Sequence, residues 1–285
     1  MPTVDAKTRV CALLGHPVGH SLSPAIHNAA FDALGLPYVY VAHDVSAARL
    51  ADAVRGAASL GYRGLSITIP HKVATLSLVD HIDPTARAIG CVNTVVCSDD
   101  GLYGKNSDGL GALNALRAAE ADPTGRAVLL LGSGGAARAL AMTLAIAAPP
   151  RQLRILGIEP PELEQLVSDV AAIGSTPVEG MALDSQTIEA SLADSDLLLQ
   201  ATPVGMAPDT ERSLVPPACL RPEVVVFDAV YNPRRTQLLL DAARQGCRVV
   251  EGLEMFLGQA AVQFELWTGH RAPIGVMRQI LEAAL

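Results

Sequence analysis

The segment LLLGSGGAARALAM (129–142) has the spacing of a loop that binds a dinucleotide phosphate. Gly132, Gly134 and Ala137 follow an apolar run directly and open a helical stretch. The first glycine permits a tight turn, the second lets backbone approach a pyrophosphate, and the small third residue lets helix and strand pack closely. The free N–H groups and the macrodipole at the helix start favour the anion. Glycine-rich turns also occur for packing alone, so this alternative stays open.

Lys72 is a candidate for proton transfer. In GLSITIPHKVATL (64–76), Thr68 lies at a strand end, and Pro70 is expected to start a helix with Lys72 in its first turn. A cation there faces the positive end of the macrodipole, which is a poor choice for stability. Partial burial at such a place would suit the lysine for acid–base work. A solvated surface lysine is the plain alternative.

Ser21 and Ser23 bracket one leucine in GHPVGHSLSPAIHNAAF (15–31), just after an apolar run. Ser23 followed by Pro24 is typical of a helix start, because the serine oxygen accepts from an unpaired N–H and proline lacks a donor there anyway. That interpretation uses only one of the two hydroxyls, and Ser21 is left over.

Two segments carry further polar residues beside apolar ones. Asn93 interrupts the strand-like run GCVNTVV (90–96), where a buried amide must find hydrogen-bond partners. Asn106 and Asp108 lie in YGKNSDGLGAL (103–113), just before a predicted helix. Asp108 taken alone needs no role beyond that of an N-cap.

Glu159 follows the strand after the glycine-rich loop, in RILGIEPPELEQL (154–166). Its carboxylate could accept a hydrogen bond from a ribose 2′-hydroxyl, or it could favour the N-terminus of the helix expected to begin at Pro160. No arginine follows the strand to hold a 2′-phosphate.

The elements that must position these residues alternate between short apolar runs and helical-period segments. Strands are expected at 10–14, 38–42, 65–69, 127–132, 153–158, 196–202, 224–230 and 248–252, and helices at 25–34, 47–60, 73–78 and 134–148. Such repetition predicts parallel sheets with right-handed crossovers. We therefore predict an α/β fold with a substrate-binding and catalytic domain at 1–107, a Rossmann-type doubly wound dinucleotide-binding domain at 108–250, and C-terminal helices at 251–285 that pack back on the first domain.

Composition narrows the class of protein. The 285 residues are half hydrophobic with 4% aromatic residues, and the formal charge is −8. The negative charge argues against a nucleic-acid or anionic-membrane partner, although a local basic pocket for a small anion is not excluded. Five cysteines without a CxxC pair, and an N-terminus without a signal pattern, predict a cytoplasmic protein with reduced thiols. Neither HExxH nor a zinc-spaced cluster is present, so no metal is expected.

Taken together and in order, these segments resemble the shikimate dehydrogenase family over essentially the whole chain. The resemblance rests on HSLSP, SITIPHK, CVNT, KNSDG, GSGGAAR, ATPVG, DAVYNP and EGLEMFLGQAAVQFELWTG. It implies interconversion of 3-dehydroshikimate and shikimate with NADP or NAD, in aromatic amino acid biosynthesis. Alcohol oxidation removes a proton and a hydride together, so a proton acceptor must reach the oxygen.

The resemblance also implies a role for each site residue. Lys72 and Asp108 would form the acid–base pair, to be treated as one coupled unit. Ser21 and Ser23 would hold the carboxylate of the substrate, and the remaining substrate-binding residues would be Thr68, Asn93, Tyr231 and Gln259. The cofactor would be bound by Gly132, Ser133, Gly134, Gly135, Ala136, Glu159, Ala201, Thr202 and Gly252.

Some positions depart from the family pattern. Ser66 and Gln200 stand where the family commonly has asparagine, and NADP-using members carry Asn-Arg-Thr or similar where this chain has Gly-Ile-Glu at 157–159. NAD use is therefore an alternative, and with it an NAD-dependent quinate or quinate/shikimate dehydrogenase. A non-catalytic nucleotide-binding regulator is a further alternative, which the retention of Lys72 and Asp108 disfavours.

Overall fold

The computed structural model describes residues 4–174 and 176–284, and the chain divides into two compact units. The first unit comprises Met1–Ser107 and Gln259–Leu285, and the second comprises Asp108–Gly258. The helix α9 (Gly252–Thr268) carries residues of both units. The sequence predicts that the dinucleotide-binding domain ends at residue 250, and the second compact unit of the structure ends at Gly258, within this helix.

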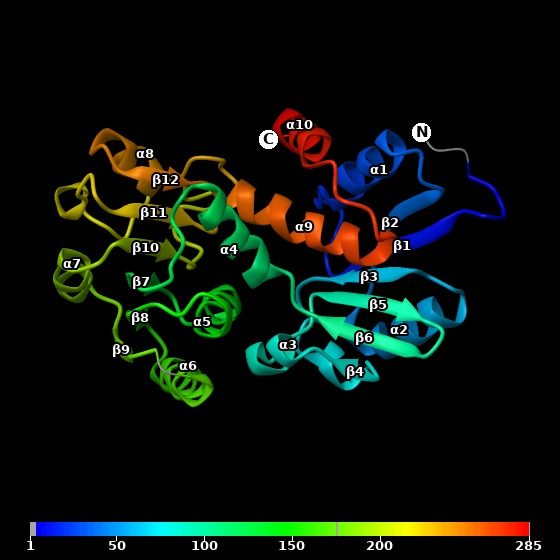
Figure 1. Ribbon diagram of the computed structural model, residues 1–285, viewed down its shortest axis with the longest axis horizontal. Helices are drawn as coiled ribbons and strands as arrows, with labels where there is room; N and C mark the ends of the chain where they lie inside the picture. The colour runs from blue at the N-terminus through cyan, green and yellow to red at the C-terminus, as the bar shows by residue number, and fades with distance from the viewer. Residues whose placement is uncertain (1–3, 175, 285) are drawn as a thin grey trace. The chain divides into compact units, whose positions relative to one another are not determined.

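The first unit is built on a six-stranded sheet in the order β2-β1-β3-β5-β6-β4 (Figure 1). Strand β1 pairs in parallel with β2 and with β3, as the alternation of strands and helices predicts. The elements of this unit are β1 (Arg9–Gly15), α1 (Ser23–Ala33), β2 (Tyr38–Asp44), η1 (Ala47–Arg49), α2 (Leu50–Ser59), β3 (Gly64–Ile67), η2 (Ala74–Ser77), β4 (His81–Ile82), α3 (Pro84–Ile89), β5 (Thr94–Ser98), β6 (Gly101–Lys105), the later part of α9, and α10 (Ile274–Ala284).

The expectation of parallel strands throughout is wrong for β5 and β6. These two strands form an antiparallel hairpin, and β5 also pairs antiparallel with β3. The connection between them, Asp99-Asp100, is too short for a crossover, which needs a dozen or more residues. Gly101 closes the turn with a φ of +137°, a conformation that favours glycine. The hairpin places the start of β5 beside the end of β3.

The second unit has a sheet in the order β12-β11-β10-β7-β8-β9 with every pair parallel (Figure 1). The strand order reverses between β7 and β10, as in a doubly wound dinucleotide-binding fold. Its elements are α4 (Asp108–Ala118), β7 (Ala127–Leu131), α5 (Gly135–Ala147), β8 (Gln152–Gly157), α6 (Pro160–Ile173), β9 (Val178–Ala182), α7 (Ser185–Ala193), β10 (Leu197–Gln200), η3 (Pro217–Cys219), β11 (Val225–Asp228), α8 (Gln237–Arg244), β12 (Arg248–Val250) and the first part of α9.

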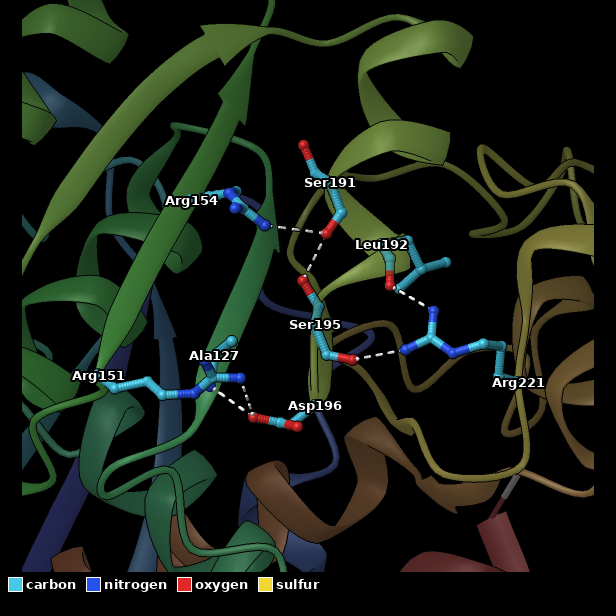
Figure 2. Close-up of polar contacts among 8 residues, drawn as sticks. All are labelled: Ala127, Arg151, Arg154, Ser191, Leu192, Ser195, Asp196 and Arg221. Atoms are coloured by element: carbon cyan, nitrogen blue, oxygen red, sulfur yellow. Dashed lines mark hydrogen bonds and ion pairs between the residues drawn. The ribbon is translucent and has the colours of Figure 1, made fainter.

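Arginines secure the end of α7 in the second unit, as Figure 2 shows. The guanidinium of Arg221 donates to the carbonyls of Leu192 (2.8 Å) and Ser195 (3.2 Å), and Arg154 donates to the carbonyl of Ser191 (3.3 Å). Carbonyls of the last helical turn lack intrahelical partners and carry negative partial charge, so cations are favourable there. These contacts hold α7 to strand β8 and to the loop before β11.

Within the described residues, no helix is long and apolar enough to cross a membrane. Four of the five cysteines are buried, and all five are free thiols. The part of the chain that the structure describes also holds no group of three or more His, Cys, Asp or Glu side chains suited to a metal ion.

Candidate functional site

The polar residues predicted near the N-terminus lie where the parallel strands β1 and β3 end. Thr68 follows β3, and its N–H donates to the carbonyl of Leu14 on β1 (3.0 Å). A Cβ on Gly15, the last residue of β1, would lie only 2.3 Å from the methyl group of Thr68, so the two strand ends are in close contact. The carboxyl ends of parallel strands are the usual place for ligands in open α/β sheets.

The prediction that Ser23 is the N-cap of α1 is wrong. The N-cap is Leu22, whose backbone is already helical and whose side chain makes no capping bond. Ser23 is buried in the first turn of α1. The Ser21 hydroxyl accepts from the N–H of Ser23 (3.3 Å). Both hydroxyls therefore lie at the start of α1 and neither serves as a conventional cap.

The buried amide of Asn93 is held by the segment just before α4. Its Oδ1 accepts from the N–H of Ser107 (2.7 Å) and the hydroxyl of Thr94 (2.7 Å), and its Nδ2 donates to the Ser107 hydroxyl (3.0 Å). Asn93 is only 3% exposed, so these bonds satisfy groups that would otherwise be costly to bury. They fix the orientation of the amide.

Gln263, which sequence reasoning missed, extends this network to β3 and β2. Its Oε1 accepts from Ser66 (2.8 Å), its Nε2 donates to the hydroxyl of Thr94 (3.0 Å), and the Tyr40 phenol donates to Ser66 (2.7 Å). Gln263 lies one helical turn after Gln259 on α9, and residues four apart share a helix face. That spacing was the available signal, because it places both amides along one side of the helix.

Lys72 does not lie in the first turn of an α-helix, which corrects the sequence prediction. It stands in a turn before the short 3₁₀ helix η2, so the macrodipole argument does not apply to it. Lys72 is half-buried, and its carbonyl accepts from the N–H of Val92 (2.9 Å), the neighbour of Asn93. The backbone of Lys72 is thus held beside the Asn93 segment.

Asp108 is the first residue of α4 and belongs to the second unit. It directly follows Ser107, whose N–H and hydroxyl bond Asn93. Consecutive Cα atoms are about 3.8 Å apart, so chain connectivity alone holds Asp108 close to the residue that contacts Asn93. Of the predicted residues, Ser21, Ser23, Thr68, Lys72, Asn93 and Gln259 belong to the first unit, and Asp108 is the first residue of the second.

The predicted phosphate loop lies at the point where the strand order of the second sheet reverses. Gly132 has a φ of +109°, and a Cβ there would lie 3.2 Å from the carbonyl oxygen of Ala201 and from Thr202 after β10. Gly134 is the N-cap of α5 without a side-chain capping bond, and a Cβ on Gly135 would meet open space. The N–H groups of the first helical turn have no intrahelical partners and suit an anion. These features fit a dinucleotide phosphate.

Two other predicted residues of the second unit lie near the end of β11. A Cβ on Gly252 would lie 2.5 Å from the carbonyl oxygen of Val230, so only glycine allows this backbone contact. Tyr231 packs against Phe256, with ring centroids 5.1 Å apart, and burial raises the pKa of its phenol.

Glu159 is exposed at the N-cap of α6, and its side chain makes no capping hydrogen bond. Glu159 thus occupies the N-cap position, as the helix interpretation predicts, but any contribution to α6 comes from its charge near the helix start and not from a capping hydrogen bond. An N-cap side chain bonds the N–H of the second or third helical residue, and the second here is Pro161, which has none.

Known proteins resemble this chain along nearly its whole length. The model of the shikimate dehydrogenase substrate binding domain matches residues 13–95, and that of the shikimate 5′-dehydrogenase C-terminal domain matches residues 252–282. A protein named shikimate dehydrogenase (NADP(+)) from Methanopyrus kandleri is 47% identical over 97% of this chain and 96% of its own length. The chain belongs to the shikimate dehydrogenase family.

Two solved structures show how far the family likeness extends. Shikimate 5-dehydrogenase from Listeria monocytogenes, in complex with shikimate and NAD, has a TM-score of 0.94 and 34% identity, covering 99% of both chains. Ligand-free 5-ketofructose reductase from a Gluconobacter strain has a TM-score of 0.92 and 32% identity, covering 99% of this chain and 100% of its own. The shikimate dehydrogenase fold is thus shared with an enzyme named for a different carbonyl substrate.

Asp228, at the end of β11, gives the stability of this family member a distinct pH dependence. Burial raises the pKa of its carboxyl to about 6, although Thr236 and the N–H of Val230 donate to it and oppose the change. An unfolded aspartate titrates near 3.9. The group therefore stabilises the fold fully below pH 4, and this contribution is lost as the pH rises through about 6.

We expect Asp228→Asn to remove this dependence. The unfolding free energy of the variant, minus that of the native chain, should rise by about 2 kcal/mol between pH 4 and pH 7, because only the native chain loses stability over this range. Urea unfolding at several pH values measures this difference. A constant difference across the range would contradict the assignment.

Proposed function

We propose that the chain catalyses the interconversion of 3-dehydroshikimate and shikimate with a nicotinamide dinucleotide, in the cytoplasm, as a step of aromatic amino acid biosynthesis. The observation that carries the proposal is the set of contacts around Asn93. Val92 holds the backbone of Lys72, and Asn93 itself holds Ser107, the residue before Asp108. The backbone of Lys72 and the residue before Asp108 are thus both held by the adjacent residues Val92 and Asn93, which supports a shared role of the two in acid–base chemistry on a hydroxyl.

Each side chain then has a task in the reaction. Lys72 takes the proton from the hydroxyl that is oxidised, and Asp108 sets the protonation state of Lys72 as its coupled partner. The nicotinamide, when bound, supplies or accepts the hydride at the same carbon. Ser21 and Ser23 donate to the substrate carboxylate from the start of α1. The remaining substrate contacts are assigned to Thr68, Asn93, Tyr231 and Gln259.

The cofactor, NADP or NAD, is assigned to the carboxyl end of the second sheet. The open start of α5 suits its pyrophosphate, and the close approach of Gly132 to the end of β10 supports a nucleotide across the switch point. The residues assigned to hold it are Gly132, Ser133, Gly134, Gly135, Ala136, Glu159, Ala201, Thr202 and Gly252.

The test is oxidation of shikimate and of quinate by purified protein with NAD⁺ and NADP⁺ in parallel, followed by the absorbance of the reduced nicotinamide. Reduction of 5-ketofructose serves as a further arm, because of the likeness to that reductase. Turnover of shikimate supports the proposal. Turnover of quinate alone, or of 5-ketofructose alone, would overturn it in favour of a related dehydrogenase, and folded protein without turnover would favour the non-catalytic alternative.

Gln263 should act on the reaction through Asn93 and Ser66 without touching the substrate. We expect Gln263→Leu to raise the KM for shikimate about tenfold or more, because buried hydroxyls of Ser66 and Thr94 lose their partner and the Asn93 segment loosens. The affinity for the nucleotide should stay unchanged. Steady-state kinetics together with nucleotide titration measure both. Gln263→Glu keeps the acceptor for Ser66 but loses the donor to Thr94 and to the carbonyl of Asn93, so it should raise the KM as well. Equal effects on KM and on nucleotide affinity would contradict this prediction.

A further inference from the structure

The end of β8 and the start of α6 lie directly against the predicted phosphate loop. A Cβ on Gly157 would lie 2.9 Å from the hydroxyl oxygen of Ser133, and the nearest atom to a Cβ on Gly134 would be Oε1 of Glu162, at 3.8 Å. In a doubly wound fold, the end of the second strand faces the ribose of the nucleotide whose pyrophosphate lies on this loop. The segment 157–162 therefore faces the position at which NAD and NADP differ, the 2′-oxygen.

Two carboxylates occupy this segment. Glu159 is exposed and its side chain makes no capping bond to α6, so its carboxylate remains available to a ligand. Glu162, which sequence reasoning did not single out, lies in the first turn of α6 with its carboxylate near Gly134. A carboxylate accepts from a 2′-hydroxyl, whereas it repels a 2′-phosphate.

The same segment offers a phosphate few donors. Pro160 and Pro161 form the first turn of α6 and have no N–H, and Ile158 is an apolar side chain that is 73% exposed. The helix start that would otherwise hold an anion is therefore poor in donors. In the sequence, no lysine occurs beyond Lys105.

The arginines of the neighbouring elements are each engaged with a carboxylate. Arg138 on α5 pairs with Asp169 on α6 (2.5 Å), and Arg154 on β8 pairs with Glu179 (3.7 Å). Arg151, just before β8, pairs with Asp196 (3.2 Å) at the opposite end of the strand (Figure 2). Recruitment of Arg138 to a 2′-phosphate would break a partly buried ion pair and leave Asp169 without its charge partner.

We infer that Glu159 and Glu162 make this chain selective for NAD: Glu159 accepts the ribose 2′-hydroxyl, and both carboxylates repel a 2′-phosphate. The inference rests on the proposed function, since it concerns the cofactor of that reaction. The inferred cofactor preference of this chain thus differs from the cofactor in the name of its relative from Methanopyrus kandleri, NADP(+).

The test is the binding of NADH and NADPH to the full chain without substrate, measured by nucleotide fluorescence. We expect NADH to bind about 100-fold more tightly, because juxtaposed like charges are strongly unfavourable, and we expect the ratio to fall as salt is raised. Glu159→Gln and Glu162→Gln should each reduce the ratio about tenfold, chiefly by tightening NADPH. Glu164→Gln, an exposed position on the same helix, is the matched control and should leave the ratio unchanged.

Equal or tighter binding of NADPH by the native chain would overturn the inference, as would a ratio that neither variant changes. Selective NADH binding by a protein that does not oxidise shikimate would support the inference and overturn the proposed function alone. Equal binding of both nucleotides together with shikimate turnover would overturn the inference and support the proposed function. Failure to bind either nucleotide would overturn both.

Discussion

Replacing Lys72 by alanine is expected to lower kcat for shikimate oxidation by about 10²- to 10⁴-fold, the usual contribution of a positioned acid or base. The side chain is half-buried, and its backbone is held next to Asn93 by the bond from Val92. Removal of the amine leaves the substrate oxygen without a proton acceptor and leaves the carboxylate contacts of Ser21 and Ser23 in place. The KM for shikimate and the affinity for the nucleotide should therefore change much less than kcat.

Stopped assays at several pH values measure this effect together with its pH profile, which should lose a titration in the variant. Lys7→Ala is the matched control, because Lys7 is an exposed lysine in the same unit. Unchanged turnover in Lys72→Ala would contradict the mechanism proposed for this family member.

Replacing Trp267 by alanine is expected to lower the unfolding free energy of the first unit by about 3–5 kcal/mol. Trp267 is fully buried on α9, its Nε1 donates to the carbonyl of Val95 (3.0 Å), and its ring packs at a tilt on His27 (centroids 5.4 Å apart). The alanine variant loses this packing and leaves the Val95 carbonyl without the indole donor. Circular dichroism during denaturant unfolding measures the loss, since the chain has one tryptophan and the variant has none.

Gly64 on β3 offers an internal check on this prediction. A Cβ there would lie 1.9 Å from the indole Nε1, so Gly64→Ala should destabilise the native chain by overpacking. In the Trp267→Ala background the same change meets a cavity and should cost little. Strong non-additivity in the double-mutant cycle is the expected result, and additive costs would contradict the packing argument.

Much of the fold follows from local patterns in the sequence. Apolar runs such as 127–132 and 153–158 correspond to β7 and β8, and the glycines at 132 and 134 stand between β7 and α5 as the phosphate-loop pattern predicts. These patterns depend on residues a few positions apart, and strand and helix periodicity is set at that range. The hairpin of β5 and β6 was missed although Asp100-Gly101 is a common turn pair.

The glycine loop, the residue types available for acid–base chemistry and most of the parallel strands can be predicted from the sequence, whereas β4, β6 and β9 were not predicted. Only the tertiary structure decided which of them are neighbours. In the structure, Ser23 is not the N-cap of α1, and Gln263 on α9 hydrogen-bonds Thr94 and the carbonyl of Asn93. The carboxylate of Glu162 lies near Gly134. These contacts join elements separated by many residues, so they depend on sheet order and helix packing. No pattern within a few positions encodes that information, because each local segment is compatible with many packings.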